Sequence, residues 1–212
     1  MEWVKDGKFM HGIRNGKLVI KVQSTGEEYV IPLSKDADKV TTTFWRHTGV
    51  EGLFHLAALK KWGDEYFVFH RKFYSQIGRK LAKEFLAAKG MKEGDGTART
   101  FFELALPQLE LSGFFLLPEQ KLELVEFSDK RVHARIWGCP NYEAWKRMGI
   151  SDEDCLKLCK LTCWSSEDLG RKGLENFDEA FAHVLNPKLK YRVYQCLPQG
   201  VEYCDIVQEI EE

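Results

Sequence analysis

The chain has 212 residues, and 31 Lys and Arg stand against 32 Asp and Glu, so the formal net charge is −1. This length suits one large domain or one domain with an appendage, and the lack of a basic excess argues against a general nucleic-acid binder. A hydrophobic fraction of 44% can fill a core, which excludes wholesale disorder. No apolar run approaches the ~20 residues of a membrane span, and the N-terminus lacks a signal-type stretch. We therefore expect a soluble, cytoplasmic protein without a nucleic-acid or membrane partner.

Residues 1–40 are predicted to form a small β-meander, an appendage to a single domain over residues 41–212. Residues 17–22 are apolar and β-branched, residues 28–32 form a second such run, and turn-forming residues lie between the two. Asn15-Gly16 favours an earlier tight hairpin. The meander either pairs with the main sheet or stands as a separate flap.

Two long helices are predicted between about Val50 and Ala88. Apolar residues recur there at three- and four-residue spacing, and Trp62-Gly63 interrupts the pattern. A further helix is predicted over residues 97–106, where Pro107 ends it.

The remaining chain is predicted to alternate between sheet and short helices. Alternating apolar residues predict strands within residues 110–138, and Ser151 is expected to cap the amide of Asp154. Further helices are predicted over residues 142–148, 151–164 and 166–185, and two final strands over about 190–197 and 202–208. These elements predict an α+β fold: a helical layer packs on an antiparallel sheet, and a cysteine-rich helical insertion precedes the last hairpin.

The six cysteines all lie in the C-terminal third of the chain. They are Cys139, Cys155, Cys159, Cys163, Cys196 and Cys204. Because the chain is large and lacks a signal, reduced thiols are favoured over disulfides. Free cysteine is also a common small core residue, so simple packing stays an alternative for each of them.

One helix is expected to carry Cys155, Cys159 and Cys163 along a single face, since they are spaced by four. The first and last of these thiols lie too far apart on a straight helix to share one metal ion, and structural zinc sites more often use CxxC knuckles. A metal site that combines two thiols of this helix with cysteines from elsewhere in the chain remains an alternative. That candidate zinc or iron set is Cys139, Cys159, Cys163 and Cys204; the other alternative is that no cofactor is bound.

Cys139 lies where a strand ends and a helix begins, beside Pro140. A thiol at a helix N-terminus has a depressed pKa, which is the usual route to a cysteine nucleophile. His133 and Arg135 share one face of the preceding strand and are candidates for holding an anionic ligand. The alternative is that this pair is the solvent face of the sheet.

Residues 50–208 resemble the L-2-amino-thiazoline-4-carboxylate hydrolase-like family. The matching segments are Gly138-Cys139-Pro140, Glu143-Ala144-Trp145, Met148-Gly149-Ile150, Asn186-Pro187-Lys188-Leu189 and Gly200-Val201-Glu202-Tyr203-Cys204-Asp205-Ile206, with Leu59, Trp62, Gly78 and Ala82 in the helical part. The resemblance implies helices against an antiparallel sheet, a relation to vinyl-reductase-type small-molecule-binding domains, and hydrolytic opening of a cyclic amidine. This chain departs from the family pattern after Cys159, where Lys160 replaces an expected nearby carboxylate.

Three functional interpretations follow from the sequence. The first is a hydrolase-like enzyme acting on a small, sulfur-containing carboxylate. Its catalytic residues would be Cys139, Cys159 and Asp205, and its substrate-binding residues would be His133, Arg135 and Trp62. The second is a non-catalytic module that binds a small molecule or a metal as a sensor or carrier. In the third, the cysteines are core residues and the function lies in an unrecognised groove. Each of the three interpretations leaves open whether the protein forms a homodimer.

Overall fold

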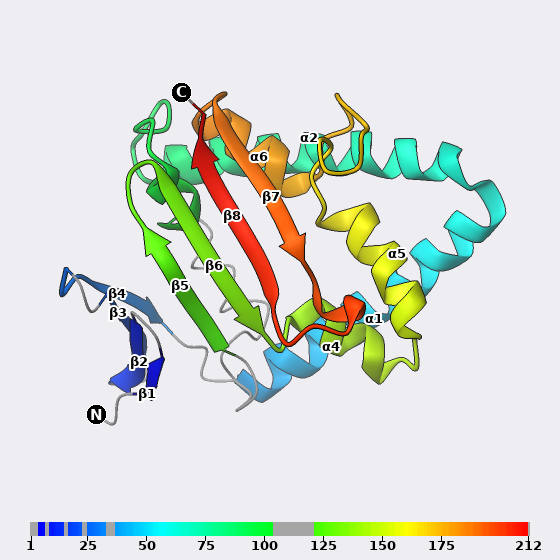
Figure 1. Cartoon of the computed structure of the whole chain (residues 1–212), viewed down its shortest axis with the longest axis horizontal. Coiled ribbons are helices and arrows are strands. Elements are labelled where there is room, and N and C mark those ends of the chain that lie inside the picture. The colour runs from blue at the N-terminus through cyan, green and yellow to red at the C-terminus, as the bar shows by residue number, and fades with distance from the viewer. Residues whose placement is uncertain are drawn as a thin grey trace.

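The computed structural model describes residues 4–6, 9–14, 17–22, 25–32, 37–103 and 121–211. This part of the chain has the predicted α+β architecture, with helices layered on an antiparallel sheet (Figure 1). The predicted strand at 114–117 and the end of the helix at 97–106 lie outside the described residues; residues 98–103 are helical.

The N-terminal strands form a four-stranded antiparallel sheet of their own, in the order β1-β2-β3-β4. The predicted meander is confirmed, although Asn15-Gly16 falls outside the described residues. Across the sheet, Ile20 pairs with His11 on one side and with Tyr29 on the other. The strands are β1 Val4–Asp6, β2 Phe9–Arg14, β3 Lys17–Val22 and β4 Glu28–Pro32. The meander therefore does not extend the second sheet.

Helices α1 (Ala37–Trp62) and α2 (Asp64–Ala88) meet at Gly63, as the sequence predicts. Gly63 has a φ of +54°, a conformation that side chains with a Cβ rarely adopt. However, α1 begins well before Val50. The early turns of α1 contain β-branched residues of low helix propensity, and propensity alone is a weak guide to where a helix begins. Gly49 and Gly52 bring α1 close to the next helical layer, where Trp145 contacts Gly52.

The second sheet has the order β5-β6-β8-β7, and every neighbouring pair is antiparallel. Its strands are β5 Lys121–Phe127, β6 Arg131–Trp137, β7 Leu189–Gln195 and β8 Cys204–Ile210. Leu122 and Leu124 of β5, with Val132 and Ala134 of β6, point into the core, as their alternation predicts. Helices α2 and α6 (Phe177–Leu185) cover this inner face (Figure 1).

At one end of this sheet lie α4 (Pro140–Arg147), α5 (Asp152–Thr162) and the short 3₁₀ helix η1 (Leu197–Gln199) (Figure 1). The predicted cap is present, because the Ser151 hydroxyl accepts a hydrogen bond from the Asp154 amide at 3.2 Å.

The predicted helix over residues 166–185 is wrong in its first half. Residues 166–176 form turns, in which Gly170 and Gly173 adopt φ values of +66° and +82°. Helix α6 begins only after Asn176, whose side chain accepts from the Glu179 amide while the Glu179 carboxylate accepts from the Asn176 amide. This capping box fixes the start of the helix.

The turns after α5 are tied to α2 by Arg71, whose side chain is fully buried. Its guanidinium donates to the carbonyl oxygens of Trp164 at 2.7 Å and Leu174 at 2.9 Å. The Glu179 carboxylate lies 3.7 Å away and balances the charge. Arg71 thereby satisfies backbone oxygens of the irregular segment, and the side-chain amide of Asn176 also donates to the Trp164 oxygen, at 3.0 Å.

No helix within the described residues is long and apolar enough to cross a membrane.

Replacing Gly78 by Ala should destabilise the fold, although the same change in an ordinary helix is stabilising. A Cβ at Gly78 would overlap the backbone carbonyl of Phe177, where α2 crosses α6. We expect a loss of about 2 kcal/mol in the free energy of unfolding, measured by urea titration. Gln76→Ala, at an exposed site on α2, is the control and should change stability by less than about 0.5 kcal/mol. Equal stability of the two variants would show that α2 and α6 do not pack this closely.

Candidate functional site

Five of the six sulfurs gather at the end of the sheet where α4, α5 and η1 meet. We call Cys139, Cys159, Cys163, Cys196 and Cys204 the thiol cluster. Cys139 follows β6, Cys196 follows β7 and Cys204 begins β8, so antiparallel strands bring three cysteines to one end (Figure 1). Hydrogen bonds link Cys139 with Cys204, and Cys159 with both Cys163 and Cys196. Residues more than sixty positions apart therefore share one location.

Cys155 does not belong to the thiol cluster, although it lies on the same helix. Its sulfur approaches the carbonyl oxygen of Ile150 at 3.9 Å, and burial raises its thiol pKa to about 11. The three helix thiols therefore do not act as one stripe. Cys155 is a packing residue.

The Cys139 thiol has a pKa below its ordinary value. The largest cause is the hydrogen bond from Cys204, and the backbone N–H groups of Tyr142 and Asn141 add to it, against the opposing effect of burial. Cys139 is the N-cap residue of α4, so these amides are the unpaired donors of a helix N-terminus. The pKa of Cys204 is raised for the complementary reason, because it donates to Cys139 and is buried. Within the pair, Cys139 is the sulfur better suited to the thiolate form.

Cys196 and Cys159 repeat this arrangement. A hydrogen bond from Cys159 lowers the pKa of Cys196 to about 7 against desolvation, and the nearby Lys160 ammonium contributes. The pKa of Cys159 is raised by its hydrogen bonds to Cys163 and Cys196 and by burial. The thiol cluster thus consists of the pair Cys139–Cys204 and the group Cys159, Cys163 and Cys196, and in each of the two one thiol has a lowered pKa.

Among the described residues, no group of three or more Cys, His, Asp or Glu side chains is placed to hold a metal ion. A structural zinc or iron shell needs several deprotonated thiolates facing one point. The thiols of the cluster instead interact with one another, Cys139 with Cys204 and Cys159 with Cys163 and Cys196. The candidate set of Cys139, Cys159, Cys163 and Cys204 therefore has no ready-made shell.

Asp205 lies on the opposite face of the sheet from the thiol cluster. It directly follows Cys204, and consecutive residues of a strand point to opposite faces. Its carboxylate oxygen Oδ1 lies 2.5 Å from Nε2 of His133 and 3.8 Å from Nε of Arg135. The structure therefore separates Asp205 from the predicted catalytic thiols and brings it together with the two predicted anion-binding residues.

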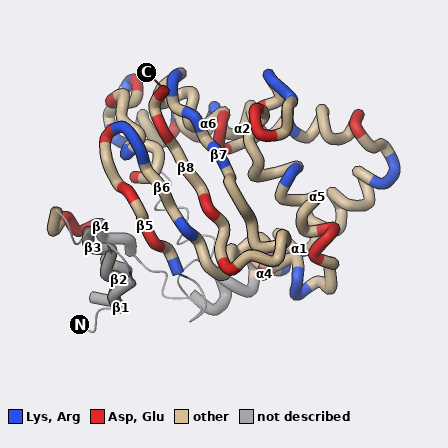
Figure 2. The backbone as a smooth tube through the Cα atoms, in the orientation of Figure 1, with Lys and Arg blue, Asp and Glu red and all other residues tan. Residues whose placement is uncertain are grey.

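His133 and Arg135 belong to a charged ladder on the outer face of the sheet. Arg135 also pairs with Glu123 at 3.6 Å, and Arg131 pairs with Glu209 at 3.2 Å. Figure 2 shows basic and acidic residues interspersed along these strands. This agrees with the alternative that the pair lies on the solvent face of the sheet, where carboxylates already contact both side chains. Trp62 is also remote from the thiol cluster, half-exposed at the end of α1.

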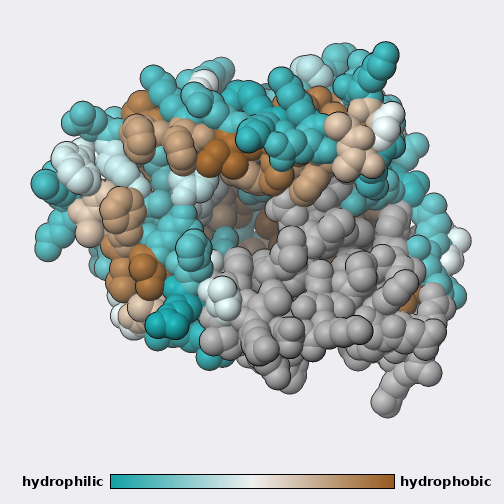
Figure 3. All heavy atoms as spheres, turned by 180° about the vertical axis from the view of Figure 1, so that it is seen from behind, coloured by the Kyte–Doolittle hydropathy of each residue, from teal (hydrophilic) through white to brown (hydrophobic). Residues whose placement is uncertain are grey.

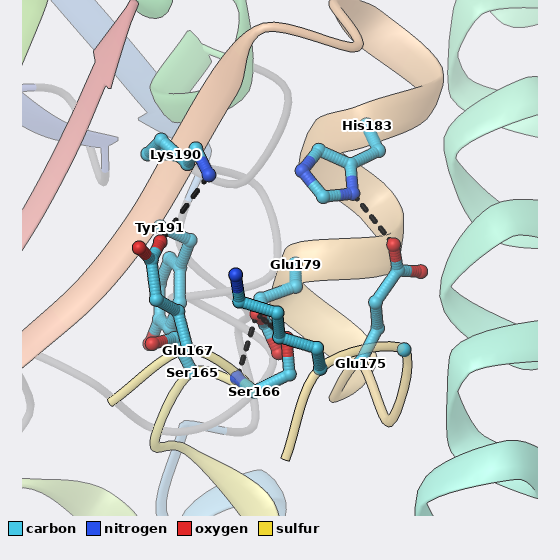
Figure 4. Close-up of a pocket in the computed structure, with 10 residues that line it drawn as sticks. Ser165, Ser166, Glu167, Glu175, Glu179, His183, Lys190 and Tyr191 are labelled. Carbon is cyan, nitrogen blue, oxygen red and sulfur yellow. Dashed lines mark hydrogen bonds and ion pairs between the residues drawn. The ribbon is translucent and has the colours of Figure 1, made fainter. Parts of the chain in front are cut away.

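A cleft of about 280 Å³ lies at the edge strand β7, bounded by α6 and the turns after α5. Its sequence positions carry no motif, and nothing in the local pattern predicts that they meet. The side chains that define it are those of Ser166, Glu175, Glu179, His183, Lys190 and Tyr191 (Figure 4).

Glu179 forms the buried floor of this cleft. One carboxylate oxygen accepts from the Ser166 amide at 2.7 Å and from its hydroxyl at 2.8 Å, and the other accepts from the Asn176 amide at 2.8 Å. With Arg71 nearby, its charge and its acceptor sites are used inside the fold. Glu179 is therefore a structural residue.

His183 is held in one orientation at the wall of the cleft. Its Nδ1 lies 2.7 Å from Oε1 of Glu175, and Arg79 pairs with the same carboxylate. These contacts keep the pKa of Glu175 below its usual range, His183 contributing most. The other ring nitrogen, Nε2, turns toward the cleft (Figure 4) and has no hydrogen-bond partner within the described chain. The imidazole thus presents one defined polar atom to a ligand.

Tyr191 also lines the cleft. Its hydroxyl hydrogen-bonds to the Asp178 carboxyl group, whose pKa burial raises to about 6. Desolvation and the neighbouring Asp178, Cys163 and Cys204 raise the pKa of Tyr191. Tyr191 therefore lines the cleft and also lies within the electrostatic influence of two thiols of the cluster.

Comparison with known proteins gives no family for the chain. No family model matches it, and no curated protein matches it. Among solved structures it is similar to the phenol-responsive sensory domain of the transcription activator PoxR with phenol. That likeness has a TM-score of 0.45 at 10% identity and covers 96% of this chain and 85% of that chain. The hydrolase-like resemblance drawn from the sequence is thus unsupported by any family match.

Alkylation should modify Cys139 ahead of the buried thiols, because it is partly exposed and its pKa is lowered. The thiolate is the reactive form, so the rate at neutral pH should exceed that of Cys155, whose pKa is raised. Peptide mapping after iodoacetamide treatment across a pH series measures both rates.

The same pH series tests whether the Cys204 thiol is what lowers the pKa of Cys139. Cys204→Ala removes the donor and should move the Cys139 midpoint to higher pH, whereas Cys204→Ser keeps a donor and should move it less. If Cys139 reacts no faster than Cys155, or if both variants behave alike, the pairing is not what activates Cys139.

Proposed function

We propose that the chain is a small-molecule-binding module whose ligand occupies the cleft at β7. The observation that carries this proposal is the convergence of polar groups from three separate segments around about 280 Å³, with an imidazole fixed by Glu175 and Arg79. Ligand sites are usually such clefts, with a few well-placed polar groups that set orientation. This volume is at the lower end of their range, so the ligand is small.

The charges around the cleft favour an anionic or strongly accepting group on the ligand. Glu179 is balanced by Arg71 and Glu175 by Arg79, so neither carboxylate needs a cation from outside. His183, Lys172 and Lys190 are the basic side chains that line the cleft, and Lys190 lies 3.2 Å from the rim carboxylate of Glu167. A small carboxylate meets these requirements, because its oxygens accept hydrogen bonds from imidazole and ammonium groups.

Binding of small carboxylates tests the proposal directly. The probes are benzoate and 2-amino-2-thiazoline-4-carboxylate, each compared with a neutral analogue, benzamide or 2-amino-2-thiazoline. We expect the carboxylates to raise the melting temperature and to bind more tightly in calorimetry than the neutral analogues. His183→Ala should weaken carboxylate binding by about tenfold, which corresponds to ~1.4 kcal/mol.

His133→Ala is the matched control, since this histidine also contacts a carboxylate but lies on the outer face of the sheet. It should leave carboxylate affinity unchanged. Equal binding of neutral and charged probes, or equal loss in both histidine variants, would refute the cleft as the carboxylate site.

Hydrolase-like catalysis by Cys139 is a second candidate function, favoured by the lowered pKa of that thiol at the start of α4. The Cys139 thiolate would bond to the amidine carbon, and the ring C–S bond would break as its sulfur takes a proton. Water would then add to the same carbon and displace the Cys139 thiolate, which releases the ring-opened urea product. Chromatography of 2-amino-2-thiazoline-4-carboxylate incubated with the protein separates the two functions. Turnover that is lost in Cys139→Ser supports catalysis, whereas binding without turnover supports the module. Elemental analysis of the same preparation tests the thiol-metal alternative.

A further inference from the structure

A row of large apolar side chains lies exposed on α1 and α2. Phe54 and Phe69 are 60% and 61% exposed, which is unusual for phenylalanine in a folded chain. We call this row the aromatic face; its members are Val50, Leu53, Phe54, Trp62, Phe69, Phe73 and Ile77. Viewed from behind, apolar surface follows the line of α2 (Figure 3).

Ring contacts connect the aromatic side chains of this face, in part through the buried ring of Tyr66. The rings of Phe69 and Phe73 stack with centroids 6.0 Å apart, and Tyr66 connects Phe69 with Phe54 through centroid distances of 6.3 and 6.4 Å. Trp62 joins it through Tyr66 at 6.3 Å. Single exposed apolar residues need no explanation, but a contiguous patch marks an interaction surface.

The size of the aromatic face matches one half of a stable protein interface. Four rings, each about half exposed, present on the order of 400 Å² of apolar surface. An interface of standard size buries about 800 Å² per partner, and slightly more than half of that area is apolar. The aromatic face thus supplies nearly all the apolar area that such an interface needs.

The charges at the two ends of the face point to a second copy of this chain. Glu65, Phe69, Phe73 and Ile77 follow one another at four-residue spacing on α2, and Lys80 continues the same side of the helix. Glu65 belongs to this side, because it borders a hollow of about 190 Å³ together with Trp62, Tyr66 and Phe69. The stripe therefore runs from an acid through apolar residues to a base.

Antiparallel pairing of two such stripes is self-complementary. Glu65 lies about 12 Å before Phe73 along the helix axis and Lys80 about 10 Å after it, from a rise of ~1.5 Å per residue. A two-fold axis at Phe73 therefore places Glu65 of each copy opposite Lys80 of the other, and Phe69 opposite Ile77. Isologous contacts of this kind close a dimer. We propose that the aromatic face is the interface of a homodimer in which the two α2 helices pair antiparallel.

Light scattering coupled to gel filtration tests the dimer with the whole chain. The wild type should elute with about twice the monomer mass of 24.6 kDa. The double variant Phe69→Lys with Phe73→Lys should elute as a monomer at concentrations where the wild type is a dimer. Tyr194→Lys is the control, since Tyr194 is a comparably exposed aromatic residue, 53% exposed, on strand β7. It should remain dimeric, and circular dichroism should show all variants folded.

Charge exchange tests the pairing itself. Glu65→Lys and Lys80→Glu should each weaken the dimer several-fold, and the two substitutions combined should restore it. A monomeric wild type overturns the dimer. A dimer that survives the double phenylalanine change places the interface elsewhere, and a missing rescue overturns the antiparallel arrangement.

Discussion

The buried guanidinium of Arg71 is the interaction on which the rest of this structure depends. It reaches from α2 to backbone oxygens at Trp164 and Leu174, at the two ends of the irregular segment that follows α5. That segment frames the cleft and holds the end of α5, where Cys159 and Cys163 lie. A buried charge is tolerated only when its donors and its balancing anion are in place, so Arg71 and Glu179 specify one path for the segment.

Much of the fold follows from sequence patterns because those patterns act locally. Strand alternation assigns the inner face of β5 and β6, Gly63 separates the two long helices, and the cap at Ser151 starts α5. The helix predicted over residues 166–185 fails because its apolar pattern belongs to α6 alone; Gly170 and Gly173 take positive φ values upstream of it. The early start of α1 also escapes prediction, because its first turns carry β-branched residues of low helix propensity and propensity is only a weak guide to helix boundaries.

The candidate site could be predicted only in part from such local sequence patterns. The gathering of Cys139 and Cys204 depends on which strands are neighbours, and the sequence does not state the strand order. Period-two alternation does place Asp205 opposite Cys204, so their separation was readable from sequence. The cleft was not readable, because His183 and Glu175 meet through the turn that Arg71 holds, and no spacing rule describes that turn.

The strand order has a consequence for how the chain acquires its site. Strand β8 lies between β6 and β7, so it must insert beside a partner formed some seventy residues earlier; His133 pairs with Val207. Non-local pairings of this kind form slowly, because a long loop must close before any contact compensates its lost entropy. During synthesis Cys139 therefore lacks its hydrogen-bond donor, Cys204, until β8 has been made. A polypeptide that stops before β8 would expose this thiol beside an incomplete edge of the sheet.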